Sequence, residues 1–244
     1  MLRIIKFVVW ATTFALIVSG VAVGAQDAPM TREQGAAILN ELRQIRQLLE
    51  KQAQSNTAVR SKLKLDGEYW LGKKDAPLTM VEFVDYQCAF CRQFETTTFS
   101  EIREKYIDTG KLRFISLNLP LSIHADAMQA AEAVLCAGDQ GEFWTMRKAL
   151  FSNAGNLSHN DILEYAQRLH IDVPLFRSCL ENSKHKSEIQ KHLQEAEALK
   201  VTGTPSFLLG KTTPEGVEGD VIVGARPLSI FEDKLKELGE NTLQ

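Results

Sequence analysis

Cys88 and Cys91 stand three positions apart in the sequence Cys88-Ala89-Phe90-Cys91. An apolar segment over residues 78–84 precedes them and a helical pattern follows, so the pair lies at a predicted strand-to-helix junction. Unpaired N–H groups and the dipole of a helix N-terminus stabilise a thiolate, the reactive form of cysteine. The position favours a redox pair in which Cys88 is the exposed nucleophile and the more buried Cys91 resolves the mixed disulfide. Half of a zinc knuckle or a structural pair is the alternative interpretation.

The N-terminus predicts the compartment. Residues 1–25 combine a short basic start, an uncharged apolar run over residues 7–23 and small residues before Gln26. These are the parts of a secretory signal peptide. An uncleaved membrane anchor is the alternative, because the apolar run is near the lower length limit for spanning a bilayer. Either interpretation exports the rest of the chain, and we expect a periplasmic protein.

The other two cysteines, Cys136 and Cys179, fall in a helical block. In an exported chain, four cysteines fit complete pairing, and we expect a structural disulfide between these two. A second redox pair that tunes the first is the alternative. A four-cysteine metal site is disfavoured, because Cys136 and Cys179 lack the close spacing of paired metal ligands.

Composition excludes some classes of function. The chain has 244 residues, of which 44% are hydrophobic and 24% are charged, as in an ordinary globular protein. Its formal net charge of -3 argues against a nucleic-acid partner, which would favour a basic surface. The histidines suggest no metal site. We expect His124 to pack at a helix start, and four others to lie on the surface: His159, His170, His185 and His192.

An amphipathic helix is predicted ahead of the domain, within an N-terminal helix and linker over residues 26–62. Thr31 and Gln34 form a capping-box pattern at its start. Apolar residues then recur at heptad-type spacing: Ile38, Leu42, Ile45 and Leu49. This seam spans only about two heptads, which is marginal for an isolated helix. It either forms a coiled coil between copies, giving a homo-oligomer through residues 31–54, or packs on its own domain.

Residues 63–244 predict one α/β domain. Strands are expected at 78–84, 112–118, 206–209 and 221–223, and helices from the cysteine pair to about 108, over most of about 122–200, and from 227 to about 240. A long helical stretch between two groups of strands indicates a helical insertion in an α/β fold rather than two consecutive domains.

Several segments, in this order, resemble the DsbA-like branch of the thioredoxin superfamily. They are residues 81–94, 124–133, 136–144, 201–207 and 224–227. The resemblance covers roughly residues 65–240. It implies a thioredoxin fold with an inserted helical subdomain and a thiol–disulfide exchange activity, with neither a cofactor nor a metal.

The resemblance also implies a substrate site. The family's matching proline is cis and lies beside the cysteine pair, which gives Pro205 this position and lets the Thr204 backbone bind a substrate chain as an added strand. Ala89 and Phe90, between the two cysteines, would complete the binding surface. For an isolated Thr-Pro sequence, an ordinary trans turn is the alternative.

Glu82, six residues before Cys88, matches the family's buried acidic position beneath the pair. Such a group can pass a proton to or from Cys91 during exchange. The alternative is a strand glutamate that faces solvent.

The dipeptide between the cysteines departs from the family pattern. The family often has proline where this chain has Ala89, and its strongly oxidising members have a histidine in the dipeptide, whereas Phe90 cannot act as a charge partner. We expect the pKa of Cys88 to lie below that of free cysteine, by less than in a histidine-bearing site.

We therefore predict an exported thiol:disulfide oxidoreductase that forms, reduces or isomerises disulfide bonds in proteins. Its partners would be proteins with cysteines or disulfides and a membrane redox partner that regenerates the pair. A monomer favours the oxidase direction and an oligomer favours isomerase or reductase. Two other hypotheses are a redox-inactive chaperone or binding module on the same fold, and a metal-handling protein.

Overall fold

The computed structural model describes residues 31–56 and 61–240. The predicted signal segment, residues 1–25, lies outside the described residues. The chain divides into two compact units, with the division between Gln54 and Ser55. None of the helices in the described ranges combines the length and apolar character needed to cross a lipid bilayer.

Helix α1 (Arg32–Asn56) accounts for the described part of the first unit and ends two residues beyond it. Its predicted capping box is present: the Thr31 N–H donates to Gln34 Oε1 at 3.0 Å and the Gln34 N–H donates to Thr31 Oγ1 at 3.2 Å. The helix presents large exposed apolar side chains, at Ile38, Leu39, Leu42, Ile45 and Leu48.

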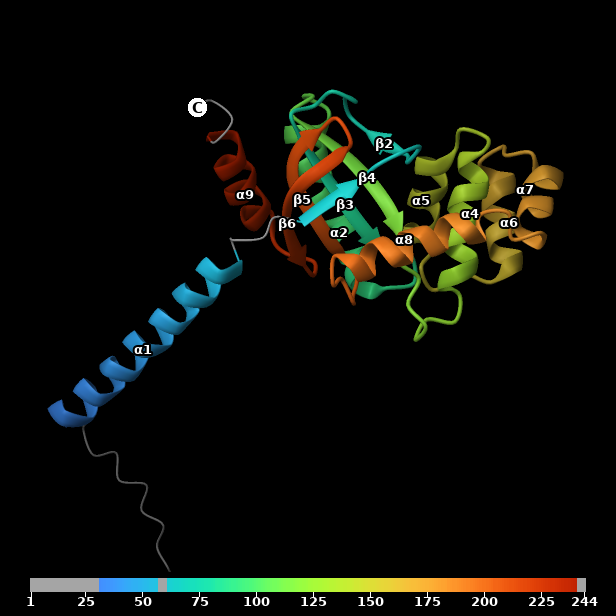
Figure 1. Cartoon of the computed structure of the whole chain (residues 1–244). Coiled ribbons are helices and arrows are strands. Elements are labelled where there is room, and N and C mark those ends of the chain that lie inside the picture. Colours follow the sequence, from blue (N-terminus) through green and yellow to red (C-terminus); the bar gives the residue numbers. More distant parts are fainter. Residues whose placement is uncertain (1–30, 57–60, 241–244) are drawn as a thin grey trace, which may run out of the picture. The chain divides into compact units, whose positions relative to one another are not determined.

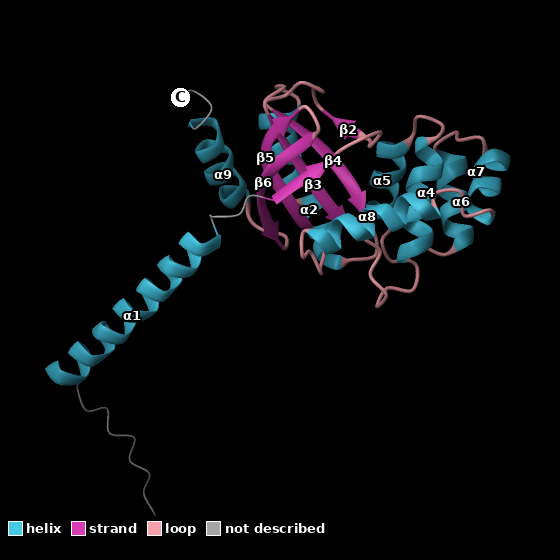
Figure 2. Ribbon diagram, viewed as in Figure 1, coloured by secondary structure: helices cyan, strands magenta, loops and turns pink. Residues whose placement is uncertain are grey.

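The second unit is built on a six-stranded mixed sheet with strand order β1-β6-β5-β3-β4-β2 (Figure 2). The strands are β1 (Ser61–Lys64), β2 (Trp70–Leu71), β3 (Leu78–Val84), β4 (Leu112–Asn118), β5 (Ser206–Thr213) and β6 (Gly216–Val223). Strand β3 is central and buried along its whole length, parallel to β4 and antiparallel to β5. All four predicted strands are present, β5 and β6 being longer than expected. The short edge strands β1 and β2 were not predicted.

The helix expected to run from the cysteine pair to about residue 108 is instead three consecutive pieces. They are α2 (Ala89–Thr96), α3 (Thr98–Ile102) and the π-helical turn η1 (Arg103–Ile107). The break falls at Thr97, whose hydroxyl donates to the Gln93 carbonyl at 2.7 Å, while the Thr96 hydroxyl donates to the Arg92 carbonyl at 2.9 Å. Hydroxyl groups that bond to carbonyls one turn back bend helices, which explains the break.

The helical insertion lies between β4 and β5, as predicted (Figure 1). Its helices are α4 (Ala127–Gly138), α5 (Phe143–Ser152), α6 (His159–Arg168), α7 (Val173–Glu181) and α8 (Lys186–Ala198). A disulfide between Cys136 and Cys179 joins α4 to α7, with Cα atoms 5.9 Å apart. Closing a loop of 43 residues contributes about 4 kcal/mol in the chain-entropy model.

The sheet is covered on both faces. On one face, Phe94 of α2 and Phe231 of α9 (Leu228–Glu240) pack with Met80 of β3. On the other, Ala196 of α8 packs with Phe83. A third apolar cluster, which fills the insertion, also includes both cysteines of the redox motif, so the insertion and the cysteine pair share one core.

Two of the histidines expected on the surface are buried: His185 is 8% exposed and His192 is 2% exposed. His192 faces the sheet, where its Nδ1 accepts the backbone N–H of Asn118 at 3.3 Å. Burial lowers the pKa of His192 to about 4, so its ring is neutral and able to accept this bond. His192 lies three residues after Ile189 and four before Ala196, the other buried residues of α8, so helical spacing in the sequence was a signal of its burial.

Candidate active site

The two cysteines of the motif lie where β3 meets α2. Cys88 is the N-cap of α2, with extended backbone angles (φ -71°, ψ 123°), and Cys91 lies in the first turn. Both are free thiols. Cys88 is 5% exposed and Cys91 is fully buried, in the order expected for an attacking and a resolving thiol.

Asp85 holds the loop that presents Cys88. One of its carboxylate oxygens accepts the Gln87 N–H at 2.8 Å. The other accepts the Leu121 N–H at 2.9 Å and lies 2.8 Å from Nδ1 of His124. His124, expected to pack at a helix start, thus bonds to this loop. Asp85 thereby connects the cysteine loop to the chain that leads into the insertion.

Thr204 and Pro205 lie beside Cys88. The Thr204–Pro205 peptide bond is cis, and the Cys88 Sγ lies 3.4 Å from the Thr204 carbonyl oxygen, which accepts a hydrogen bond from the thiol while Cys88 is protonated. The Thr204 hydroxyl oxygen is buried and has no hydrogen-bond partner in the structure. The fold therefore brings together two segments that are 116 positions apart in the chain.

The two thiols differ strongly in acidity. A hydrogen bond from the Cys91 thiol lowers the pKa of Cys88 to about 5, with further help from the Thr204 side chain and from the backbone N–H groups of Cys91 and Phe90, although burial opposes this. Burial, followed by the bond to Cys88, raises the pKa of Cys91. The reduced pair therefore holds one thiolate, on Cys88, and one thiol, on Cys91.

Glu82 lies beneath this pair, on β3, and is fully buried. Its Oε2 accepts a hydrogen bond of 2.7 Å from Nη2 of Arg147, while its Oε1 has no partner in the structure. Burial raises the pKa of Glu82, and the Arg147 charge opposes that rise. Glu82 is near enough for its charge to raise the pKa of Cys91. The alternative of a solvent-facing strand glutamate is excluded.

Arg147, on α5, was not predicted. It is 1% exposed and pairs with both Glu82 and Glu95, which raises the pKa of Arg147 although burial opposes this. Its guanidinium carbon lies 4.9 Å from the ring centre of Phe151 and 5.0 Å from that of Phe99, in cation–π range.

A sequence signal for Arg147 exists. Four apolar residues lie three or four positions before and after it, so a helix places the arginine on its apolar face: Phe143, Trp144, Leu150 and Phe151. A charge on such a face needs a buried partner of opposite charge.

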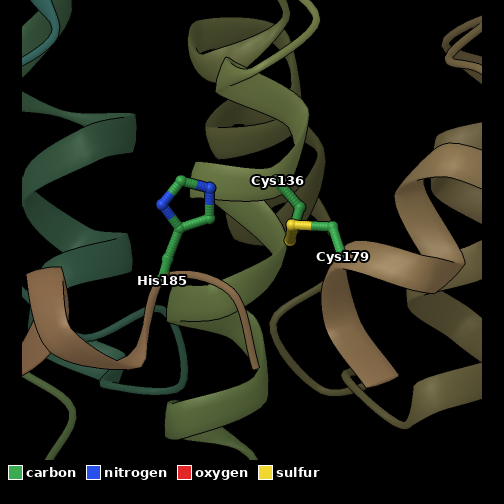
Figure 3. Close-up of side chains that lie close together, drawn as sticks. All are labelled: Cys136, Cys179 and His185. Carbon is green, nitrogen blue, oxygen red and sulfur yellow. A yellow bond between two sulfur atoms is a disulfide. The ribbon is translucent and has the colours of Figure 1, made fainter. Parts of the chain in front are cut away.

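Ala89 and Phe90 face solvent at the start of α2, and the Phe90 side chain is 63% exposed. An exposed aromatic ring between the two cysteines offers an apolar contact for a peptide. Cys136 and Cys179, by contrast, are bonded to each other inside the insertion. Among the described residues, the group with metal-ligand types and close ligand atoms is Cys136, Cys179 and His185 (Figure 3).

Comparisons with known proteins agree on the fold. The family model described as thioredoxin matches residues 64–218. The probable disulfide bond formation protein D of Bacillus cereus is 31% identical over 144 residues, which cover 56% of this chain and 67% of that protein. The Na(+)/H(+) antiporter NhaA 1 of Salinispora arenicola is 37% identical over 167 residues, or 68% of this chain. The chain spans only 25% of the antiporter's length.

Two solved structures with the same fold are matched over nearly their whole length. The α-DsbA1 protein of Wolbachia pipientis superposes with a TM-score of 0.64 at 24% identity, over 74% of this chain and 95% of that one. Oxidised BdbD from Bacillus subtilis gives a TM-score of 0.64 at 22% identity, over 74% and 97% of the two chains.

The acidity of Cys88 leads to a first prediction. In the reduced protein, we expect the rate of Cys88 alkylation by iodoacetamide to rise with pH around a midpoint of about 5, because the thiolate is the reacting species. Mass spectrometry of the alkylated peptide measures the rate at this site. Cys91→Ala removes the hydrogen bond that lowers the pKa of Cys88 and should raise the midpoint, whereas Cys91→Ser retains a donor and should raise it less. A wild-type midpoint at or above that of free cysteine would contradict this account.

A second prediction concerns Arg147. Arg147→Leu leaves two carboxylates unpaired in the core, and loss of one partner from a buried ion pair costs about 3–5 kcal/mol. We expect the free energy of unfolding in urea to fall by that amount. Lys148→Leu, at the exposed neighbouring position of α5, is the matched control and should change the stability little. Equal stabilities of the two variants would show that the ion pairs of Arg147 with Glu82 and Glu95 have no such structural role.

Proposed function

Since the chain belongs to the thioredoxin family and resembles a disulfide bond formation protein over two thirds of that protein's length, we propose that it is a DsbA-like thiol:disulfide oxidoreductase acting on protein cysteines through Cys88 and Cys91. The observation that carries the proposal is the position of the Cys88 sulfur. It lies at the N-terminus of α2, 3.4 Å from the Thr204 carbonyl oxygen, with a pKa lowered to about 5. A merely structural pair has no need for a stabilised thiolate.

The proposed exchange proceeds in two displacements. With the pair oxidised, a substrate thiolate attacks the Cys88 sulfur, the Cys88–Cys91 bond breaks and Cys91 leaves as a thiolate. A second substrate thiolate then attacks the substrate sulfur of the mixed disulfide, the substrate disulfide forms and Cys88 leaves as a thiolate. The reverse sequence reduces a substrate. The low pKa of Cys88 makes it a good leaving group, which supports the oxidising direction.

We propose that Glu82 transfers a proton to Cys91, or accepts one from it, during exchange. This thiol is fully buried and its pKa is raised, so its thiolate needs a nearby proton donor when it leaves. Glu82 is also buried, its pKa is raised, and its Oε1 is not occupied by any hydrogen bond. In the reducing direction the same carboxylate accepts the proton from Cys91.

The substrate is proposed to bind as an extended peptide beside Thr204 and Pro205, with Ala89 and Phe90 in contact. Hydrogen bonds between the substrate main chain and the Thr204 backbone would give affinity for many substrate sequences. The exposed Phe90 ring would favour substrates with apolar residues beside their cysteine. Residues 1–25 support export to the periplasm, where a membrane redox partner would regenerate the pair.

Turnover tests the enzyme directly. We expect the wild type to catalyse insulin reduction by dithiothreitol or the recovery of activity from reduced and scrambled ribonuclease, and Cys88→Ser to abolish both. Glu82→Gln should slow the step that involves Cys91 by roughly 100-fold and flatten its pH profile, because it removes a general acid–base group. If the wild type and Cys88→Ser gave the same rates, neither of them above that of the uncatalysed reaction, the redox-inactive chaperone or binding module would be favoured instead. The measured redox potential of the Cys88–Cys91 pair decides whether the protein oxidises or reduces its substrates, because a less negative potential makes the pair the stronger oxidant.

We also propose that α1 makes the protein a homo-oligomer through residues 31–54. Its apolar seam is exposed, with Ile38 and Ile45 each about half accessible, and burying such a seam against another copy would stabilise an otherwise marginal helix. An assembly would place several active sites together, an arrangement suited to isomerisation.

Light scattering after size-exclusion chromatography tests the assembly. The chain without residues 1–25 should elute as an oligomer, and Ile38→Glu with Ile45→Glu should convert it to a monomer, because the charges cannot be buried in the seam. Gln44→Glu with Gln47→Glu adds the same charge at other exposed α1 positions and should leave the mass unchanged. A monomeric wild type would contradict self-association.

A further inference from the structure

We propose that, once the Cys136–Cys179 disulfide is reduced, the two cysteines bind a zinc ion together with His185 and Asp139. The sulfur atoms of the disulfide and a ring nitrogen of His185 lie within 4.8 Å of one another. Figure 3 shows the imidazole beside the disulfide, with the three side chains coming from α4, α7 and the turn before α8. Asp139, at the C-terminus of α4, supplies a fourth ligand atom.

The Asp139 carboxylate completes the donor set. Its Oδ2 lies 2.9 Å from Nε2 of His185 and 3.7 Å from the Cys179 sulfur. Two sulfurs, one imidazole nitrogen and one carboxylate oxygen form a four-coordinate set of the types that zinc accepts. Two tetrahedral zinc-bound sulfurs lie about 3.8 Å apart, given Zn–S bonds of about 2.3 Å. With Cα atoms 5.9 Å apart, side-chain rotation can supply that separation.

His185 is already oriented as a metal ligand would be. Its other nitrogen, Nδ1, lies 2.8 Å from a carboxylate oxygen of Glu188. A carboxylate on the second ring nitrogen is the usual partner of a zinc-bound histidine, because it sets the ring's orientation and tautomer. Asp139 and Glu188 flank the ring, one at each nitrogen, so zinc would take the place of the proton between Nε2 and Asp139.

The charge and access of the site also suit a cation. Cys136 is 1% exposed, Cys179 is 9% exposed and His185 is 8% exposed, so these three ligands are largely shielded from water, whereas Asp139 lies at the exposed edge of the site. A cavity of about 330 Å³, lined in part by Cys136, Asp139 and Cys179, borders the site and gives an entry path. Two thiolates and a carboxylate would leave one net negative charge on the zinc site. Lys184, whose Nζ lies 2.8 Å from Asp139 Oδ2, offsets this charge.

The reduction step needs a dithiol donor. The donor gives two electrons and two protons, its own sulfurs form a disulfide, and the Cys136–Cys179 bond breaks to give two thiols. Zinc binding then releases both thiol protons and the proton on Nε2 of His185. The pair would thus be a disulfide under oxidising conditions and a zinc site under reducing ones, coupling metal retention to the redox state.

Zinc content of the full chain tests this. The double variant Cys88→Ser, Cys91→Ser removes the other thiols. A phosphine then reduces the Cys136–Cys179 disulfide, and with one water molecule it gives two thiols and the phosphine oxide. We expect one zinc per chain after reduction and gel filtration, none in the oxidised protein, and the visible bands of tetrahedral cobalt when Co²⁺ replaces zinc. Glu188→Gln, which changes a positioning residue, should weaken zinc binding by roughly 10–100-fold. His170→Asn, an exposed histidine at a positive φ that asparagine tolerates, is the control and should bind as the parent does.

Several outcomes would overturn the proposal. Absence of zinc from the reduced chain would leave the pair as a structural disulfide only. Zinc binding unchanged in His185→Ala or Asp139→Ala would indicate non-specific capture by the thiols. Circular dichroism checks that the reduced chain is folded, and zinc should raise its melting temperature but not that of the Cys136→Ser, Cys179→Ser variant. A reduced chain that stays unfolded with zinc present would also refute the site.

Discussion

The buried charge of Arg147 is the constraint on which the arrangement of this domain depends. A guanidinium that is 1% exposed is tolerable only with carboxylate partners. The two partners come from different elements, Glu82 from β3 and Glu95 from α2, while Arg147 itself comes from α5 of the insertion. One ion-pair network therefore links the central strand, the helix that carries the cysteines and the inserted subdomain. Any displacement of the insertion would expose or unpair these charges.

The same network shapes the chemistry above it. One carboxylate oxygen of Glu82 accepts a hydrogen bond from Arg147, and the other has no partner. Glu82 lies near Cys91, whose pKa is raised by burial. Cys88, only three residues away, has the opposite environment, because it sits at a helix N-terminus with several hydrogen-bond donors. The contrast between the two thiols arises from their positions along one helical turn, and it explains why an alanine–phenylalanine dipeptide without a charged group still permits a stabilised thiolate.

The insertion contributes more than a cover for the sheet. Its apolar core includes both cysteines of the motif, and Asp85 ties the cysteine loop to the chain entering α4. Its own disulfide lies among ionisable side chains rather than in a purely apolar environment, since Asp139, His185 and Glu188 form a chain of close contacts beside it. A purely structural crosslink does not require such neighbours, and their geometry distinguishes this part of the fold.

Local patterns were enough for much of the fold. Three local patterns predicted their elements correctly. The apolar run before Cys88 forms β3, the alternation at 112–118 forms β4, and the capping box at Thr31 begins α1. Tertiary structure alone decided what depends on contacts between distant segments. The carbonyl of Thr204 reaches Cys88 across 116 positions, Arg147 reaches Glu82 across 65, and Cys136 and Cys179 meet His185 only after α4 and α7 pack. Spacing in the sequence measures distance along the chain, whereas burial, charge pairing and ligand geometry depend on distance through space.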